Sequence, residues 1–441
     1  MKGMKSVNAY RYRWLILLSL VLLILAVEIQ WLNLAPVSRV ANSFYEQQLS
    51  IRSFRPVDVL SLTYMVVFVL ASIPSSYLLH RLGIRWAAWI ASGLIVVGSL
   101  IKWFYPADFS MVWTGQLLLA LAQSLVLNSI TEIISRWFPV RERGMAVGIT
   151  SASQYLSFAA VMVLSPMMVV SRADDPGWGS GFAHLMQIYA LFSILAALAS
   201  ALLIKENPPT PSSTFNSPIT SQRFFSSFKA INAIASLRGL MIIFSIGWGV
   251  LMTLFIKIDD IQALLGFPDS NGFLGIAMFA GGMVGAILLP ALSDRFRRRK
   301  LFFVFCNVCS IPGVLLLVFC QQLGSVVLSS EIIAMIGSSI IGLSLLASIP
   351  IGSQYAAELG QGINEEVIQG MLLLYSQVAC IIILSVALVS SERYSLMVLS
   401  TLASLLGASM IGSTFLKESK VIITEEERLK EVIEQEIVHL Q

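Results

Sequence analysis

The residues best suited to chemistry lie in one short stretch, residues 28–33 (EIQWLN), inside the first long apolar segment. A carboxylate, two amides and an indole are costly within a lipid-spanning helix, and they persist where they face protein or a water-filled cavity. At about 100° per residue, Glu28 and Trp31 share one helix face, while Gln30 and Asn33 point roughly the other way. We expect the first pair to face a cavity that takes a small molecule and the second to face a neighbouring helix.

Each member of the first pair has two interpretations. Glu28 is a candidate for proton coupling, because a buried carboxylate can take up and release a proton; alternatively, it is a structural group bonded to another helix. Trp31 is either an interfacial residue at the headgroup level or a cavity wall. A tryptophan face attracts organic cations by about 0.5–2 kcal/mol, which favours such substrates without selecting one.

Further candidates lie on other apolar segments. Gln116 and Gln123 are seven residues apart, so they share a helix face. We interpret Gln123 as a hydrogen-bonding group for a substrate near the middle of the membrane, the alternative being a bond between helices. Gln154 and Gln377 occupy related places in the two halves of the chain, and Trp248 lies between two glycines of the seventh segment.

Charged residues close the seventh segment, and they predict an ion pair or an extracellular gate rather than a buried ion site: Lys257, Asp259 and Asp260. No glycine-rich nucleotide loop, metal-ligand spacing or catalytic triad is apparent, so we expect neither an enzyme nor a bound metal or cofactor. Cys306 and Cys309 fall in an apolar segment without charged neighbours and are interpreted as packing residues.

Composition places most of the chain in a bilayer. Of its 441 residues, 56% are hydrophobic and 12% are charged, against about 25% charged in soluble domains. The net charge of +4 does not indicate nucleic-acid binding, because the basic residues cluster between apolar runs. The first run is a full span, so we expect no cleavable signal peptide.

Twelve apolar windows of about 20 residues recur along the sequence. They cover 14–37, 57–80, 86–104, 111–137, 144–170, 184–204, 238–260, 271–293, 301–320, 329–354, 367–390 and 394–416. An even number of spans puts both termini on one side, and most Lys and Arg residues fall on that side. Because basic loops stay in the cytoplasm, we expect a multi-pass plasma membrane protein, or bacterial inner membrane protein, with both termini cytoplasmic.

Polar segments divide the chain into four parts. We expect a six-helix bundle over 1–204, a proline-rich cytoplasmic linker over 205–237, a second six-helix bundle over 238–416, and an amphipathic, acidic tail helix over 417–441. We expect the protein to be a monomer.

The two halves repeat one another weakly. The second span ends in residues 80–85 (HRLGIR) and the eighth in residues 293–300 (SDRFRRRK), and His80 and Asp294 are 214 residues apart. Gln154 and Gln377 are separated by a similar 223 residues. Two homologous halves with a site between them are the plan of a secondary transporter.

Residues 281–300, with Asp294-Arg295 and the basic run that follows, resemble the loop signature of the major facilitator superfamily. The resemblance implies a cytoplasmic gate in which Asp294, Arg295 and Arg298 take part, with Arg81 in the first-half copy. That copy departs from the family by having His80 where an acidic residue usually stands.

Several short motifs resemble the branch of this superfamily that contains the feline leukaemia virus subgroup C receptors. They are Ile29-Gln30-Trp31, Gly115-Gln116 with Ala122-Gln123, Arg136-Trp137-Phe138-Pro139, Pro350-Ile351-Gly352 with Ala357-Glu358, and Gly370 with Gln377. Members of that branch are described as carriers of choline and ethanolamine, and earlier as haem exporters. The resemblance implies that Trp31, Gln123 and Gln377 line a central cavity.

The chain departs from that branch at two places. The tyrosine on the seventh span of the family falls at Met252, for which Trp248 or Phe255 is a substitute, and Glu28 stands where the family has a small residue.

The sequence therefore predicts an all-α membrane protein of twelve transmembrane helices in two pseudo-symmetric six-helix bundles. Its predicted function is the transport of a small organic solute by alternating access, with a cation like choline or ethanolamine favoured. The alternatives are proton symport of an amino acid, nucleoside or other metabolite through Glu28, and transport of haem or another bulky amphipathic compound. A membrane receptor is disfavoured because no segment is long enough for a large soluble domain.

Overall fold

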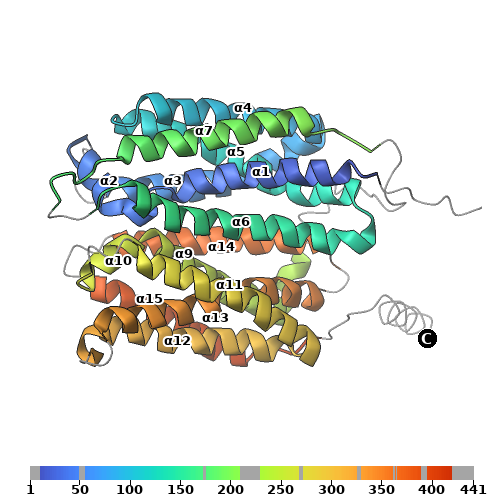
Figure 1. Cartoon of the computed structure of the whole chain (residues 1–441). Helices are drawn as coiled ribbons and strands as arrows, with labels where there is room; N and C mark the ends of the chain where they lie inside the picture. The colour runs from blue at the N-terminus through green and yellow to red at the C-terminus, as the bar shows by residue number, and fades with distance from the viewer. Residues whose placement is uncertain are drawn as a thin grey trace, which may run out of the picture. The chain divides into compact units, whose positions relative to one another are not determined.

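The computed structural model describes residues 10–48, 55–171, 175–208, 229–267, 272–324, 329–360, 363, 365–388 and 395–419 (Figure 1). Within these residues every regular element is a helix. The side chain of His80, most of the predicted linker and the predicted tail helix lie outside the described part.

The helices in chain order are α1 (Arg13–Leu32), η1 (Ala35–Val37), α2 (Ser38–Tyr45), η2 (Glu46–Gln48), α3 (Pro56–Leu82), α4 (Ile84–Phe104), α5 (Phe109–Trp137), α6 (Val140–Met168), α7 (Phe182–Leu203), α9 (Ala235–Ile256), α10 (Ile258–Leu264), α11 (Phe273–Phe296), α12 (Arg299–Leu323), α13 (Ser330–Leu359), α14 (Glu365–Leu388) and α15 (Ser395–Thr414).

Eleven helical segments of the described chain are long and apolar enough to cross a membrane, the first running Arg13–Tyr45. The twelfth predicted span corresponds to α15, a helix of 20 residues. Long runs of Leu, Ile, Val and Ala form helices here because lipid offers no hydrogen bonds, so each segment must satisfy its own backbone. The predicted all-helical membrane fold is confirmed.

The chain forms two compact units, which differ in their boundaries from the predicted halves. Unit 1 contains residues 1–219, 252–276 and 377–398, and unit 2 contains the remaining residues. The end of α9 and the whole of α10 therefore belong with the first-half helices, although they come from the second half of the sequence. The predicted division into parts at residues 204 and 238 stays a prediction.

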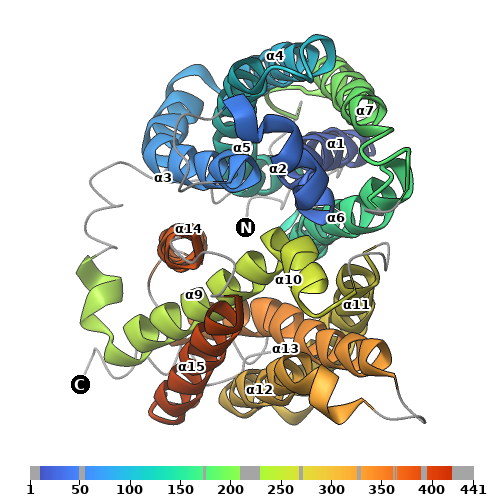
Figure 2. The same ribbon diagram turned by 90° about the vertical axis from the view of Figure 1, so that its left-hand side faces the viewer.

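Within unit 1, α1 packs against α5, α6 and α7, while α4 packs against α5 and α7 (Figure 2). Two helical segments of this unit are interrupted. The first helix ends at Leu32 and continues, after Asn33 and Leu34, into η1; α9 ends at Ile256, and α10 begins two residues later. These interruptions lie beside the candidate site.

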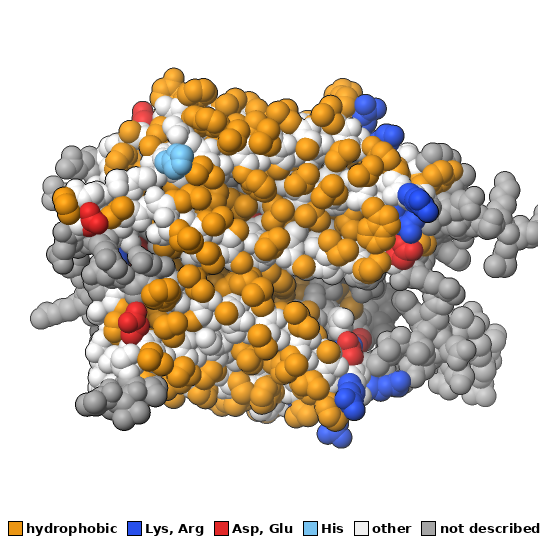
Figure 3. Space-filling model, in the orientation of Figure 1, with side chains coloured by type: hydrophobic (Ala, Val, Ile, Leu, Met, Phe, Trp, Pro, Cys, Tyr) orange, Lys and Arg blue, Asp and Glu red, His pale blue; other side chains and the backbone are white. Residues whose placement is uncertain are grey.

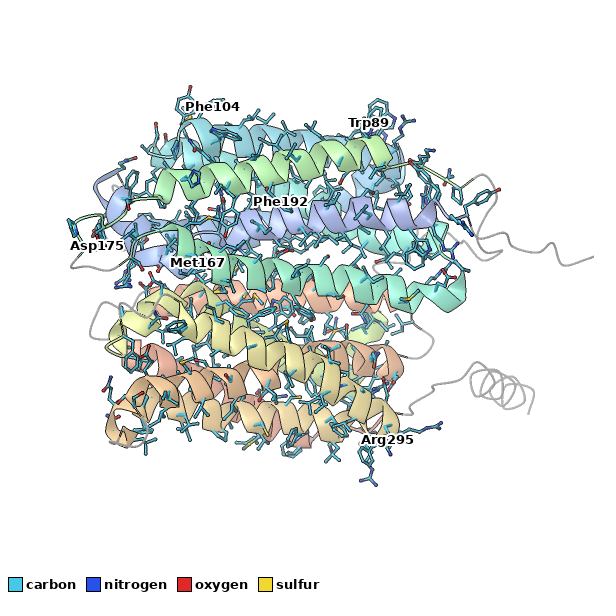
Figure 4. All side chains as sticks on the ribbon, in the orientation of Figure 1. Trp89, Phe104, Met167, Asp175, Phe192 and Arg295 are labelled. Carbon is cyan, nitrogen blue, oxygen red and sulfur yellow. The ribbon has the colours of Figure 1, made fainter. Side chains whose placement is uncertain are left out.

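Side-chain type varies along the helices. Hydrophobic side chains cover their middle parts, and charged ones gather near their ends (Figure 3). Trp89 and Phe104 mark the opposite ends of α4, and Asp175 lies at the Phe104 end (Figure 4). The Trp89 end of unit 1, where α1 begins and α7 ends, carries a row of basic residues: Arg13, Arg81, Arg85, Arg136, Arg143 and Lys205.

Two glycines bring α4 and α5 into backbone contact. A Cβ atom added at Gly98 would lie 2.8 Å from the carbonyl oxygen of Gly115, and one added at Gly115 would lie 2.8 Å from that of Gly98. Since backbone atoms cannot move aside cheaply, these helices approach closely only because both positions lack a side chain.

We predict that Gly115→Ala costs about 1–3 kcal/mol of stability through overpacking, seen as a lower melting temperature of the purified protein. Gly93→Ala is the matched control, since Gly93 lies in α4 with no atom within 4 Å of its added Cβ. Equal melting temperatures for the two variants would contradict the close crossing.

Candidate functional site

Trp31 is the centre of an aromatic cluster in unit 1. Its ring stacks on Tyr64 of α3 at 6.2 Å between centroids, and Phe158 of α6 meets it edge-on at 6.1 Å. Phe255, at the end of α9, lies 6.1 Å from Phe158. All four side chains are buried. They form an apolar, π-rich cluster with one ring from each of four helices: α1, α3, α6 and α9.

Glu28 forms the polar side of the same place. It is one turn before Trp31 on α1 and 1% exposed. Its Oε1 atom accepts hydrogen bonds from Nε2 of Gln123 at 3.3 Å and from Nε2 of Gln154 at 3.4 Å. Within the described residues Glu28 Oε2 and Trp31 Nε1 have no hydrogen-bond partner. The site thus holds one unused acceptor and one unused donor, both buried.

The structure brings together four of the residues singled out from the sequence: Glu28, Trp31, Gln123 and Gln154. Gln377 is in α14 and in the same unit, buried, with its Oε1 unpartnered among the described residues. No hydrogen bond of the described chain joins it to the other four. Trp248 belongs to unit 2, where its ring stacks on Phe244 at 6.5 Å between centroids.

Phe255 takes the place that corresponds to Trp31 in the repeat. Each is the next-to-last residue of an interrupted helix, α1 or α9. By the same count Glu28 and Met252 correspond, since each lies four residues before its helix end. The two positions at which we expect the chain to depart from the branch it resembles are therefore related by the repeat.

Sequence reasoning missed Tyr64 and Phe158. Tyr64 is fully buried, and its hydroxyl donates to the carbonyl oxygen of Val27 at 3.3 Å. A usable signal existed on α3, where Asp58, Ser61 and Tyr64 recur every three residues as a polar stripe in an apolar helix. Phe158 gave no comparable signal, because an aromatic residue on a membrane helix is ordinary.

An ion-pair cluster lies at the Phe104 end of unit 1. Lys257 Nζ lies 2.5 Å from Asp58 Oδ2 and 3.4 Å from Asp260 Oδ2. Arg55 pairs with Asp260 at 2.7 Å, and Arg39 pairs with Asp259 at 3.0 Å. The cluster joins α10 and the end of α9 to α2 and α3.

Two opposing effects act on the acidic side chains of this cluster: burial disfavours their charged form, and the neighbouring cations favour it. Burial raises the pKa of the Asp259 carboxyl above its usual value, and the Arg39 guanidinium and backbone N–H oppose that shift. The backbone N–H of Arg39 donates to Asp259 Oδ2 at 2.8 Å, and the Ser38 hydroxyl donates to the same oxygen at 3.4 Å. The charged form of Asp259 therefore depends on the hydrogen bonds and the positive charge that Ser38 and Arg39 supply.

The residues predicted for a cytoplasmic gate lie at helix ends. Asp294 is paired with Arg299, which also pairs with Glu358 at 2.9 Å. Arg81, Arg295 and Arg298 are exposed (Figure 4 labels Arg295). The gate itself stays a prediction.

The two copies of the loop signature share a backbone feature. Gly83 and Arg297, which correspond in the repeat, both have positive φ, 88° and 52°. At Gly83 this conformation places the start of α4 where Glu206 accepts hydrogen bonds from the N–H groups of Ile84 and Arg85. A carboxylate at a helix N-terminus is a favourable arrangement.

Within the described residues no group of three His, Cys, Asp or Glu side chains is placed to bind a metal. The polar groups of the site are a carboxylate, two amides and an indole, and none is an activated nucleophile. These groups can donate and accept hydrogen bonds, and the carboxylate can carry a negative charge.

An all-helical, multi-pass membrane protein with a buried polar group inside a bundle has the build of a solute transporter. The model of the Major Facilitator Superfamily matches residues 16–384. The chain therefore belongs to this superfamily, whose members are transporters and not enzymes, as the sequence predicted.

The comparisons also place the chain near one branch. It is 28% identical to "Solute carrier family 49 member A3" of Xenopus tropicalis over 85% of this chain and 77% of that protein. It is 24% identical to "Choline/ethanolamine transporter flvcr2a" of Danio rerio over 85% and 80%. The crystal structure of a D-xylose-proton symporter matches with a TM-score of 0.70 at 13% identity, covering 93% of this chain and 99% of that one. The predicted resemblance to the feline leukaemia virus receptor branch is confirmed.

We predict that Lys257→Met destabilises the protein by about 3–5 kcal/mol, because it leaves Asp58 buried without its cation. Arg55→Met is the matched control: its side chain is 47% exposed, so its pair with Asp260 contributes about 0–1 kcal/mol. Melting curves of the two purified variants test this difference. Similar losses in both would mean that burial does not distinguish the two pairs.

Proposed function

We propose that this chain transports a small ammonium compound of the choline or ethanolamine kind by alternating access. The observation that carries the proposal is the unpartnered, buried Oε2 atom of Glu28, one helical turn from Trp31. A carboxylate beside an aromatic cluster suits an organic cation, which is attracted by both. The names of several relatives, choline/ethanolamine transporters, support the same substrate class.

The roles of the side chains follow from their positions. Trp31 and its aromatic partners supply π-faces and exclude water from the cation. Glu28 supplies the counter-charge, and its attraction is strengthened because the site is shielded from solvent. Gln123 and Gln154 fix the Glu28 carboxylate through one oxygen and leave the other for the ligand. A hydroxyl group on the substrate would be a suitable acceptor for the Trp31 indole N–H.

A second candidate function is proton symport through Glu28, with an amino acid, nucleoside or other metabolite as substrate. It is favoured by the partners of Glu28, which are neutral amides rather than a basic side chain. A buried carboxylate without a cationic partner can exist in either protonation state.

The ion-pair cluster around Lys257 is proposed to be the extracellular gate. It ties α10 to helices of the first half through buried charges, and a buried charge left without its partner is strongly destabilising. Its opening would admit substrate from that side. Asp294, Arg295, Arg298, Arg81 and His80 are proposed to contribute to the opposite, cytoplasmic gate.

The membrane orientation is also a proposal. The basic row at the Trp89 end of unit 1 supports a cytoplasmic location of that end, where α1 begins. The even number of predicted spans then puts the C-terminus on the same side. We place the protein in the plasma membrane, or the bacterial inner membrane, as a monomer built of two six-helix bundles over 1–204 and 238–416.

We predict that choline and ethanolamine stabilise the purified protein in a thermal-shift assay and that Trp31→Ala weakens their binding about 2- to 30-fold through lost cation–π attraction. Trp86→Ala is the control, since Trp86 is 56% exposed and far along α4 from the site. Stabilisation only by haem or by a neutral or anionic ligand would refute the ammonium proposal.

Glu28→Gln separates the two candidate functions. If Glu28 is the counter-charge of the substrate, the variant loses both net uptake and counterflow exchange in proteoliposomes. If Glu28 couples protons, pH-driven uptake is lost while counterflow exchange continues. We expect the first result. Unchanged uptake in both assays would remove Glu28 from either role.

A further inference from the structure

One buried charge takes no part in the transport site described above. Lys102 lies in the last turn of α4, in unit 1, and is 1% exposed. A lysine buried within a membrane helix is expensive, so it persists where it has a function. In the described chain it forms no ion pair with a carboxylate.

Both hydrogen bonds of Lys102 go to carbonyl oxygens. Its Nζ atom donates to Oε1 of Gln116 on α5 at 2.9 Å and to the backbone oxygen of Gln30 on α1 at 3.3 Å. The Gln30 carbonyl is part of the peptide that joins Gln30 to Trp31. The lysine therefore contacts the very turn of α1 that carries the site.

That turn is the end of an interrupted helix. Because α1 stops at Leu32, the carbonyl groups of its last turn have no N–H partner four residues later. They form the negative end of the helix dipole, and a cation there is stabilising. Lys102 supplies this cation inside the bundle, where water is not available to do so.

The close packing of α4 on α5 places the side chain of Lys102 so that it reaches α1. The Cγ atom of Lys102 would lie 2.9 Å from a Cβ added at Gly115, so its stem occupies the space that this glycine leaves free. The side-chain oxygen of Gln116, the residue after Gly115, then accepts a hydrogen bond from the ammonium group. Seven residues further along the same face of α5, Gln123 donates to Glu28. Helix α5 thus presents an acceptor to the buried cation and a donor to the buried carboxylate.

We infer that Lys102 is a positioning residue for the substrate site: its ammonium group caps the interrupted end of α1 and holds the turn that carries Glu28 and Trp31. The consequence for ligand binding rests on the proposed function, whereas the capping of α1 does not. The role is distinguished from general stabilisation by where its effects fall, since a positioning residue changes ligand affinity and the protection of the last turn of α1 rather than the stability of the whole bundle.

The test is Lys102→Met, with Lys102→Arg as the variant that keeps the charge. We expect Lys102→Met to bind choline and ethanolamine about 10- to 100-fold more weakly. It should also melt at a lower temperature, because the carbonyl oxygens of Gln30 and Gln116 lose their donor. Amide hydrogen exchange should rise over residues 28–34 and stay unchanged in α7. Lys102→Arg should recover at least part of both the binding and the protection.

Ser99→Ala is the matched control. Ser99 lies one turn before Lys102 on the same face, and its buried hydroxyl has no partner within the described residues; its removal should change neither readout. Wild-type exchange over residues 28–34 in Lys102→Met would overturn the inference, as would a lower melting temperature with unchanged affinity. If the wild type binds neither compound while exchange still rises in Lys102→Met, the proposed substrate class fails and the capping role stands.

Discussion

The interruption of α1 at Leu32 is the constraint on which the surrounding structure depends. In lipid every exposed carbonyl must find a donor within the protein. At the interrupted end, Lys102 donates to the carbonyl oxygen of Gln30 and Ser165 to that of Asn33. One turn earlier, Tyr64 and Ser193 add second hydrogen bonds to the carbonyl oxygens of Val27 and Ala26. The polar residues of α3, α4, α6 and α7 therefore point inward at α1, and the site forms where that polar surround meets aromatic side chains.

The sequence predicted the spans well, because a continuous apolar run in lipid has only one regular conformation available. It also placed Glu28, Gln123 and Gln154 among the site residues, since a polar group at membrane depth must face protein. It could not show that these three side chains bond one another, which depends on how the helices rotate against each other. The contact of Lys102 with α1 was missed for the same reason, whereas the polar stripe of α3 did mark Tyr64.

The repeat explains why the site is chemically one-sided. Glu28 and Met252 hold corresponding places near the ends of interrupted helices, as do Trp31 and Phe255. The first member of each pair offers a charge or an N–H group, whereas the second is apolar. At these two pairs of positions, the first half of the chain supplies polar groups and the second half apolar ones.

The ion-pair cluster around Lys257 has an electrical consequence. It holds three cations, Arg39, Arg55 and Lys257, and three anions, Asp58, Asp259 and Asp260. A group that is neutral as a whole does no net work against the membrane potential when it shifts together, whereas a single charge does work of about 2.3 kcal/mol per 100 mV. As long as the cluster stays paired, the membrane potential therefore does no net work on it.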